Sequence, residues 1–252
     1  MRINYRALSV VLAAGVLALS AVGCVCTAEK VEIVDMMSES HSIDLEGAEH
    51  VRVVLEIGIG DLEITGGASD ALLEADFTYN VAEWKPEISY EVSDGDGILH
   101  VRQPSTGKLS ITGRAKNHWE LALNENVPMT MSLEMGVGEA SLDLGGLDLS
   151  DLTVDHGVGE LRIDLTGHVD DDLFASIDGG VGKIELSVPY SVGVRIDADT
   201  GIGGLSTRGF SRRKGVLTND AYGTSDVTLD IDIDSGIGGI SVISSDTTVG
   251  SI

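Results

Sequence analysis

The sequence predicts an all-β fold, a single-chain β-solenoid (β-helix-like) in which coils of about 22 residues stack on one another. Three observations predict it. The chain of 252 residues is rich in glycine, with 32, and poor in proline, with 4, which favours short strands joined by glycine turns. No segment keeps a helical period. Finally, a segment with a central Gly-X-Gly recurs along the chain.

The recurring segment is clearest in the second half of the chain. It reads MSLEMGVGEASLDL from Met131 and LTVDHGVGELRIDL from Leu152. The first glycine of each copy lies at Gly58, Gly136, Gly157, Gly180, Gly201 and Gly236, so the middle spacings are 21, 23 and 21 residues. Two short strands that meet at a glycine corner are therefore expected in each copy.

Apolar residues occupy fixed positions in every copy. The residue three before the first glycine is apolar, as in Leu133 and Val154, and the residue between the glycines is β-branched, as in Val137 and Val158. These two positions share one parity in a strand, so we expect both to face inward. The apolar positions after the second glycine have the other parity, which indicates a bulge or corner at that glycine.

Stacking would bury the apolar face that a single coil leaves exposed. A unit of this length has too small a core alone, whereas parallel pairing with neighbouring coils covers it. About eight to ten such coils fit the chain. An antiparallel β-sandwich is the alternative, because hairpins also space strands regularly. The register shared by all copies favours the solenoid.

The N-terminus has the pattern of an export signal. Arg2 and Arg6 precede an apolar stretch at residues 7–20, and Ala-Val-Gly then leads into Cys24. Ala-Val-Gly-Cys resembles the lipobox of bacterial lipoproteins, which implies a lipid anchor on Cys24 and membrane contact through it. An ordinary signal peptide with a free cysteine, or an uncleaved membrane anchor, is the alternative. Each of them places the rest of the chain outside the cytoplasm.

Four segments follow from these patterns. We expect a lipoprotein signal peptide at 1–23, a lipid-anchored linker at 24–44, a less regular part of the solenoid at 45–127 and regular repeats at 128–252. Val25 follows the anchor cysteine, in place of the aspartate that retains lipoproteins in the inner membrane. The outer membrane is therefore expected if the bacterium has two membranes.

Charge and missing motifs exclude several function classes. The formal net charge is −25, from 41 acidic and 16 basic residues. A surface this acidic repels nucleic acid, so nucleic-acid binding is excluded. The sequence contains no Gly-X-Ser-X-Gly and no His-Glu-X-X-His, and its six histidines are dispersed. We therefore expect no enzyme activity and no cofactor, Ca²⁺ aside.

Four motifs in succession carry a family resemblance. They are GIGDLEITGG near Gly58, WKPEISYEVSDGDGILHVRQP from Trp84, HWELALNENVP from His118 and the long double repeat from Met135. With them, residues 45–243 resemble the LiaF-like toast-rack family of bacterial adhesin-type proteins. The resemblance implies a β-solenoid at the cell envelope, commonly beside systems that sense cell-wall stress, with no known chemistry. Relatives of the LiaF type usually carry transmembrane helices ahead of this region, where this chain has a lipoprotein signal.

An acidic residue stands two positions before the first glycine of each copy. In stacked coils, Glu134, Asp155, Asp178 and Asp199 would lie about 5 Å from their neighbours. Like charges so close are unfavourable unless they are solvated or bridged by cations, so this column is a candidate Ca²⁺ site. A solvated outward face is the alternative.

Four cations cluster between the copies at Gly201 and Gly236. They are Arg208, Arg212, Arg213 and Lys214. Such a cluster suits an anionic envelope polymer, a lipid headgroup or an acidic patch on a partner protein. A solvated loop that pairs with the acidic body of the protein is the alternative.

Large aromatic residues are concentrated before residue 128. We expect Trp84, Trp119, Tyr79 and Tyr90 to cap the solenoid core, with exposed carbohydrate-binding aromatics as the alternative. Together, the patterns favour a non-enzymatic adhesion or interaction module, or an envelope-stress scaffold, anchored at the cell envelope. The alternatives are a carbohydrate-active β-helix enzyme and a structural element that self-associates through its terminal coils.

Overall fold

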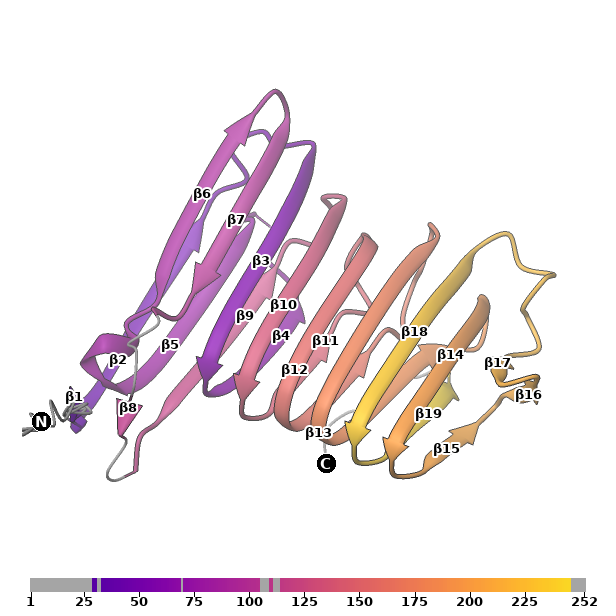
Figure 1. The fold of residues 1–252 in the computed structure, drawn as a ribbon. Coiled ribbons are helices and arrows are strands. Elements are labelled where there is room, and N and C mark those ends of the chain that lie inside the picture. Colours follow the sequence, from indigo (N-terminus) through magenta and orange to yellow (C-terminus); the bar gives the residue numbers. More distant parts are fainter. Residues whose placement is uncertain (1–28, 31–32, 69, 105–108, 111–113, 246–252) are drawn as a thin grey trace, which may run out of the picture.

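Strands lie side by side along one elongated stack in Figure 1. The structure is a computed structural model that describes residues 29–30, 33–68, 70–104, 109–110 and 114–245. Strands form most of this described chain, with one short 3₁₀ turn, η1 (Ala82–Trp84). No helix within the described ranges is long and apolar enough to cross a membrane. The predicted signal peptide and Cys24 lie outside the described residues.

One sheet of 17 strands contains almost all of the described strands. Its members are β2 (Ile33–Ile43), β3 (His50–Ile59), β4 (Asp61–Gly66), β5 (Leu73–Val81), β6 (Glu87–Ser93), β7 (Asp96–Arg102), β9 (Asn117–Leu123), β10 (Met129–Val137), β11 (Ala140–Asp143), β12 (Leu149–Asp164), β13 (Leu173–Pro189), β14 (Gly193–Ile202), β15 (Leu205–Arg208), β16 (Ser211–Arg213), β17 (Val216–Thr218), β18 (Thr228–Ile237) and β19 (Ile240–Ser245). β1 (Glu29–Lys30) and β8 (Leu109–Ser110) form a separate parallel pair.

Each coil contributes to two layers of this sheet. The part before the glycine corner, such as β3 or β10, lies in a first layer, and the part after it, such as β4 or β11, lies in a second. β12 and β13 run through the corner as single long strands. Neighbouring coils pair in parallel in both layers. This parallel stack confirms the predicted β-solenoid over the antiparallel sandwich.

The coils do not stack in chain order. The order is β7 with β9, β3 with β4, β10 with β11, β12, β13, β18 with β19, and β14 with β15. The copy at 228–245 therefore lies between the copies at 173–189 and 193–208. These seven coils are fewer than the predicted number of about eight to ten, because the remaining strands do not form coils but extend the two ends of the stack.

Antiparallel strands form both extensions. At the N-terminal end, β9 pairs with β5 and β5 with β2, while β6 pairs with β7. At the other end, β17 pairs with β14 and β16 pairs with β17. Since β2 (Ile33–Ile43) pairs with β5 at Ile33 and from Met37 to Ile43, the predicted linker at 24–44 is wrong for this strand, which belongs to the folded domain.

The core lies between the two layers and is made by alternate residues of each strand. Leu133 and Met135 are buried before the corner, and Ala140 and Leu142 are buried after it. Val137, between the two glycines, is 46% exposed. The prediction that this position faces inward is wrong, because the inward alternation ends at Met135 and Val137 lies on the outside of the corner, whose second glycine, Gly138, has a φ of 146°.

Close approach between coils explains the paired glycines. A Cβ on Gly157 would lie 2.4 Å from the carbonyl oxygen of Gly136, and a Cβ on Gly159 would lie 1.7 Å from that of Gly138. Gly159 also has a φ of 143°, which residues with a side chain rarely adopt. Any other residue would force neighbouring coils apart, so backbone packing requires glycine at both positions.

Aromatic side chains fill the core at the N-terminal end. Phe77 and Trp119 pack edge to face, with ring centroids 5.1 Å apart. Trp84 and Tyr79 are also buried, and the half-buried Tyr90 packs against the core. The prediction that the aromatics cap the solenoid core is confirmed for Trp119, Tyr79 and Tyr90, whereas Trp84 packs with Val81 in a separate small cluster.

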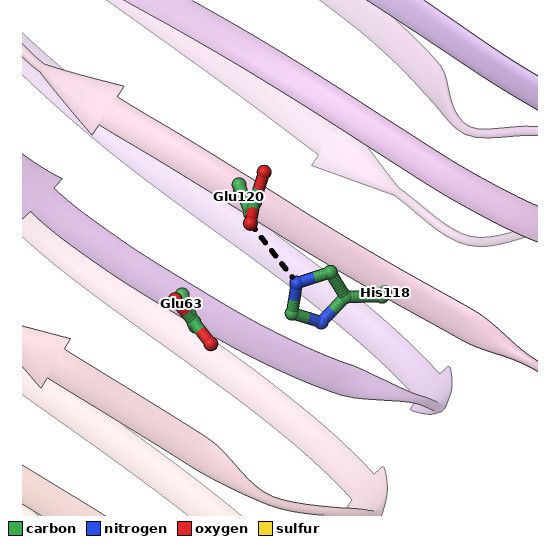
Figure 2. A group of neighbouring side chains, drawn as sticks. All are labelled: Glu63, His118 and Glu120. Carbon is green, nitrogen blue, oxygen red and sulfur yellow. Dashed lines mark hydrogen bonds and ion pairs between the residues drawn. The ribbon is translucent and has the colours of Figure 1, made fainter.

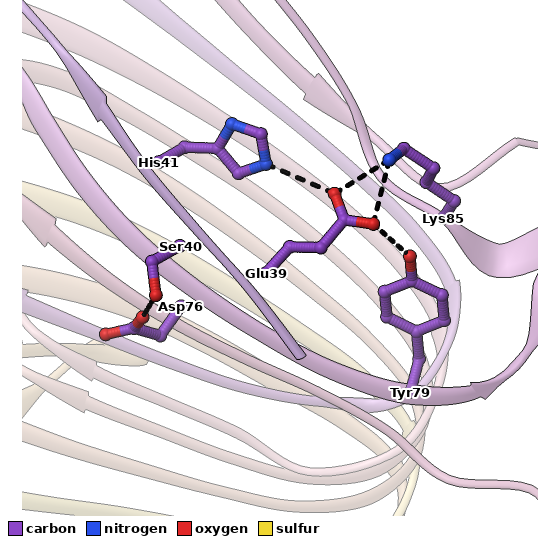
Figure 3. A network of polar contacts seen from close by, with 6 residues as sticks. All are labelled: Glu39, Ser40, His41, Asp76, Tyr79 and Lys85. Carbon is purple, nitrogen blue, oxygen red and sulfur yellow. Dashed lines mark hydrogen bonds and ion pairs between the residues drawn. The ribbon is translucent and has the colours of Figure 1, made fainter. Parts of the chain in front are cut away.

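A polar network around Glu39 holds β2 in place (Figure 3). Lys85 Nζ donates to both carboxylate oxygens of Glu39 at 2.8 Å, and the Tyr79 hydroxyl donates to one of them at 2.6 Å. Lys85 first, and then Tyr79, lower the pKa of Glu39 to about 2. Burial, with the nearby Glu39, raises the pKa of Tyr79 to about 12. Glu39 therefore stays ionised and ties β2 to the residues at and after β5.

Candidate functional site

The predicted acidic column forms a continuous row on the outside of the first layer. Strand register places Glu134 beside Glu56 and Asp155, and Asp178 beside Asp155 and Asp234. Asp199 pairs with Asp234 at the end of the row. We call this row the acidic ladder; in stacking order it is Glu56, Glu134, Asp155, Asp178, Asp234 and Asp199, all of them exposed. The geometric part of the prediction is confirmed.

An open groove follows the acidic ladder. It has a volume of about 630 Å³ and is lined by five ladder residues, by corner glycines and by His156. Asp178 lies in the middle of the row. Partial burial, followed by the charges of Asp155 and Asp234, raises the pKa of Asp178. The groove is therefore a concentrated source of negative potential.

Aliphatic side chains, exposed apart from the half-buried Ile59, form a second row beside the acidic ladder. They occupy the position between the two glycines of each corner, and the strand register aligns them from coil to coil. We call this row the aliphatic ridge; it consists of Ile59, Val137, Val158, Val181, Ile237 and Ile202. Ile202 is 70% exposed. Sequence reasoning missed this surface, although a β-branched residue held between two glycines was its signal.

Calcium binding on the acidic ladder remains a prediction. Ca²⁺ takes six to eight oxygen ligands, so it needs several oxygen atoms close together. Among the described residues, the group in which three ligand atoms lie within 4.8 Å of one another is Glu63, His118 and Glu120, which is not part of the ladder. The ladder is thus an extended row of carboxylates rather than a compact cage.

The predicted basic cluster lies at the far end of the stack (Figure 1). Arg208 ends β15, Arg212 and Arg213 lie on β16, and Lys214 lies in the turn of the β16–β17 hairpin. All four side chains are exposed, and within the described chain none of them forms an ion pair with a carboxylate. Their role in partner binding remains a prediction.

His156 is the histidine nearest to the acidic ladder, but it faces the core. It is buried, and its Nε2 lies 3.1 Å from the carbonyl oxygen of Gly138. Burial lowers the pKa of His156, and the contact with Gly138 opposes that effect only in part. The imidazole therefore fills the place that Met135 occupies in the adjacent coil.

Comparisons with known proteins address the fold and the family. The family model described as the N-terminal domain of toast_rack matches residues 33–187. The model described as cell wall-active antibiotics response LiaF, C-terminal, matches residues 136–242. A search of curated proteins gave no match.

Solved structures include one strong likeness. A protein from Clostridium sporogenes ATCC 15579, named for cell adhesion, is 32% identical with a TM-score of 0.79, and the match covers 83% of this chain and 100% of that chain. A protein named for lipid binding from Parabacteroides distasonis ATCC 8503 is 14% identical with a TM-score of 0.30, over 85% and 99% of the two chains. An adhesin-named protein from Bacteroides fragilis NCTC 9343 is 11% identical with a TM-score of 0.23, over 85% and 99%. The last two likenesses are too weak to bear on function.

The toast-rack model thus matches more than half of the 252 residues, and the Clostridium sporogenes structure matches nearly all of the described fold. The chain belongs to the toast-rack family.

Proposed function

We propose that this protein is a lipid-anchored, non-enzymatic adhesion or interaction module of the cell envelope that binds its partner along the acidic ladder and the aliphatic ridge. The names of its relatives support the envelope setting. One family model is named for LiaF and the response to cell wall-active antibiotics, and the Clostridium sporogenes protein is named for cell adhesion. None of these names refers to a catalysed reaction.

The observation that carries the proposal is the unbroken register of the two rows. Each of the six coils that contain β3, β10, β12, β13, β18 and β14 adds one carboxylate and one aliphatic side chain at the strand spacing of about 4.8 Å. Parallel backbone pairing already orders these positions. A partner that binds along them therefore does not have to order this surface, which favours binding. The surface is complementary to a partner with cationic groups along one side and apolar groups along the other.

Calcium and a cationic polypeptide are the two competing occupants. Calcium would neutralise Glu134, Asp155, Asp178 and Asp199 but would make no use of the exposed aliphatic ridge. A cationic amphipathic polypeptide would use both rows, and its charges would relieve the repulsion from Asp155 and Asp234 that, after burial, raises the pKa of Asp178. We therefore propose the polypeptide as the partner.

The binding test compares two variants that lose the same charge. In the ladder variant, Glu134→Gln, Asp155→Asn, Asp178→Asn and Asp234→Asn remove four carboxylates from the groove. In the control variant, Glu83→Gln, Glu91→Gln, Asp220→Asn and Asp226→Asn remove four exposed carboxylates elsewhere. The probe is a fluorescent amphipathic peptide of Lys and Leu, titrated with the full chain in detergent.

We expect the ladder variant to bind the peptide at least about tenfold more weakly, a loss of about 1.4 kcal/mol, and the control variant to bind as the natural chain does. Val158→Ser with Val181→Ser should also weaken binding, because the aliphatic ridge then loses two apolar contacts. Equal losses in the ladder and control variants would mean that net charge alone attracts the peptide, and the proposal would then be wrong.

Thermal melts with and without millimolar CaCl₂ form the second arm. A Ca²⁺ site with a Kd a hundredfold below the ion concentration would stabilise the fold by about 2.7 kcal/mol. We expect no rise in the midpoint beyond that given by NaCl of equal ionic strength. A rise specific to Ca²⁺ that the ladder variant abolishes would identify calcium as the occupant.

Lipid attachment is tested separately. Cells that produce the chain in the presence of radiolabelled palmitate should label it, and Cys24→Ser should abolish the label and release the protein from the membrane fraction. Cys26→Ser is the matched control and should leave both unchanged. Labelling that persists in Cys24→Ser would contradict the anchor.

A further inference from the structure

A cluster of different chemistry lies on the second layer at the N-terminal end. Glu63 on β4 and His118 and Glu120 on β9 leave the sheet on its outer side (Figure 2). One ligand atom from each lies within 4.8 Å of the other two. The Nε2 atom of His118 lies 3.3 Å from Oε1 of Glu120, and the parallel register places Glu63 directly beside Glu120.

The backbone that presents these three side chains is fixed on both strands. The sequence neighbours of the three ligands point inward and are buried. They are Leu62, Ile64, Asn117, Trp119 and Leu121. Trp119 Nε1 donates to Oδ1 of Asn117 at 3.0 Å. Asn117 Nδ2 in turn donates to the carbonyl oxygen of Ile59 at 2.8 Å. The spacing of the three ligands is therefore set by the core beneath them.

Charge in the cluster is uncompensated. Among the described residues, Glu63 has no hydrogen bond or ion pair, and Glu120 interacts with His118 alone. Further carboxylates stand next to the cluster, since Asp61 is in register with His118 and Asp76 with Glu120. Carboxylates grouped in this way are unfavourable unless a cation or water compensates them.

We propose that Glu63, His118 and Glu120 form a surface site for a divalent transition-metal ion, with Zn²⁺ as the ion that fits best. One imidazole nitrogen and two carboxylate oxygens are ligands that Zn²⁺ accepts, whereas Ca²⁺ and Mg²⁺ prefer oxygen alone. The exposed side leaves the fourth coordination position open to water or to a ligand atom of a partner. This site is independent of the partner proposed for the acidic ladder.

Isothermal titration with ZnCl₂ tests the site in the full chain, purified in chelator-free detergent buffer. Cys24→Ser and Cys26→Ser are included so that thiols do not bind the ion. We expect one equivalent of Zn²⁺ to bind. His118→Ala and Glu63→Gln should each weaken binding at least about tenfold, since loss even of an outer-shell partner typically costs 10- to 100-fold.

His168→Ala is the matched control. His168 is exposed and lies 3.0 Å from a carboxylate oxygen of Asp170, but the described chain supplies no third ligand there. The control should bind Zn²⁺ as the parent does. Co²⁺ gives a second readout, because the d–d absorption of the bound ion should disappear in His118→Ala.

Two results would overturn the proposal. One is an unchanged Zn²⁺ affinity in His118→Ala, which would place the ion elsewhere on the acidic surface. The other is the absence of binding heat up to millimolar ZnCl₂ in the parent. Glu120→Gln guards against loss of fold, because it keeps the shape of the side chain, and a thermal melt of each variant shows that the sheet is intact.

Discussion

The two halves of the stack are held together by different means. In the regular coils from 129 onward, rows of aliphatic side chains fill the core and paired glycines let the backbones approach closely. In the N-terminal part, aromatic rings fill the core and asparagines satisfy the backbone; Asn124 Nδ2 donates to the carbonyl oxygens of Ala68 and Ala71 at 2.9 and 2.8 Å. Close backbone packing thus holds the regular coils together, whereas specific side chains close the N-terminal end of the stack.

Removing an aromatic from the N-terminal core should have the largest effect on stability. Trp119→Ala empties a fully buried site and ends the edge-to-face contact with Phe77, so we expect a loss of about 3–5 kcal/mol in the free energy of unfolding. Urea-induced unfolding measures it. Phe174→Ala is the control in the regular half, because Phe174 is 61% exposed, and it should cost less than about 0.5 kcal/mol.

A methyl group at a glycine corner should have the next largest effect. In Gly159→Ala the Cβ would lie 1.7 Å from the carbonyl oxygen of Gly138, so neighbouring coils must separate, and we expect a loss of about 3 kcal/mol. Gly204→Ala is the control, since its Cβ meets nothing within 4 Å, and it should change stability by less than about 0.5 kcal/mol. Thermal melts that give the same midpoint for both would show that close approach does not explain the corner glycines.

Much of this fold could be predicted because the repeated sequence pattern indicates the position of each corner and the register between coils. The recurring Gly-X-Gly sets the corner, and the common spacing sets the register that aligns Glu134 with Asp155. The concentration of Tyr79 and Trp119 outside the regular copies indicated where the stack is capped. These features depend on residues that are close together in the sequence, so a single sequence is enough to predict them.

Pairing between distant coils could not be predicted. The copies at Gly201 and Gly236 have the same pattern, so either of them could follow the copy at Gly180, and the structure places the later one there. His118 meets Glu63 because β9 pairs with β4, and nothing in either segment specifies that partner. The position of Val158 was misjudged because strand parity was extended through a glycine corner, where parity does not hold.

Acidification should affect the regular half first. Burial lowers the pKa of His156 below its ordinary value of 6.5, so the unfolded state binds more protons than the folded state as the pH falls. The stabilisation that comes from neutral His156 is therefore complete above pH 6.5 and is lost as the pH falls below it. His156→Met, which copies Met135 of the adjacent coil, should flatten this dependence and change stability at pH 8 by about 1 kcal/mol or less. Urea unfolding from pH 8 to pH 5 measures it, and an unchanged slope would contradict the prediction.

The N-terminal edge should respond at lower pH. The pKa of Glu39 is lowered from 4.5 to about 2, so its stabilisation is complete above pH 4.5 and is lost as the pH falls toward 2. Lys85 is 62% exposed, so solvent screening limits the effect of Glu39→Gln at neutral pH to about 1 kcal/mol. Glutamine keeps an oxygen acceptor for the hydroxyl of Tyr79, so the substitution measures the effect of the negative charge alone. Hydrogen exchange of the amides of β2 measures the loss, and Glu87→Gln, which breaks the exposed pair with Arg102, is the control.

Replacing an aliphatic side chain on the ridge should have the smallest effect and gives the sharpest test of the corner geometry. Val158→Thr exchanges a methyl group for a hydroxyl at a side chain that is 46% exposed, where water satisfies the new group, so we expect a change of less than about 0.5 kcal/mol. Val154→Thr makes the same exchange four residues earlier at a fully buried side chain, where an unsatisfied hydroxyl costs about 1–3 kcal/mol. The two valines share strand parity. Equal losses in the free energy of unfolding, measured with urea, would therefore indicate that both side chains face inward. A loss at Val154 alone would show that the corner turns Val158 outward and leaves it free for a partner.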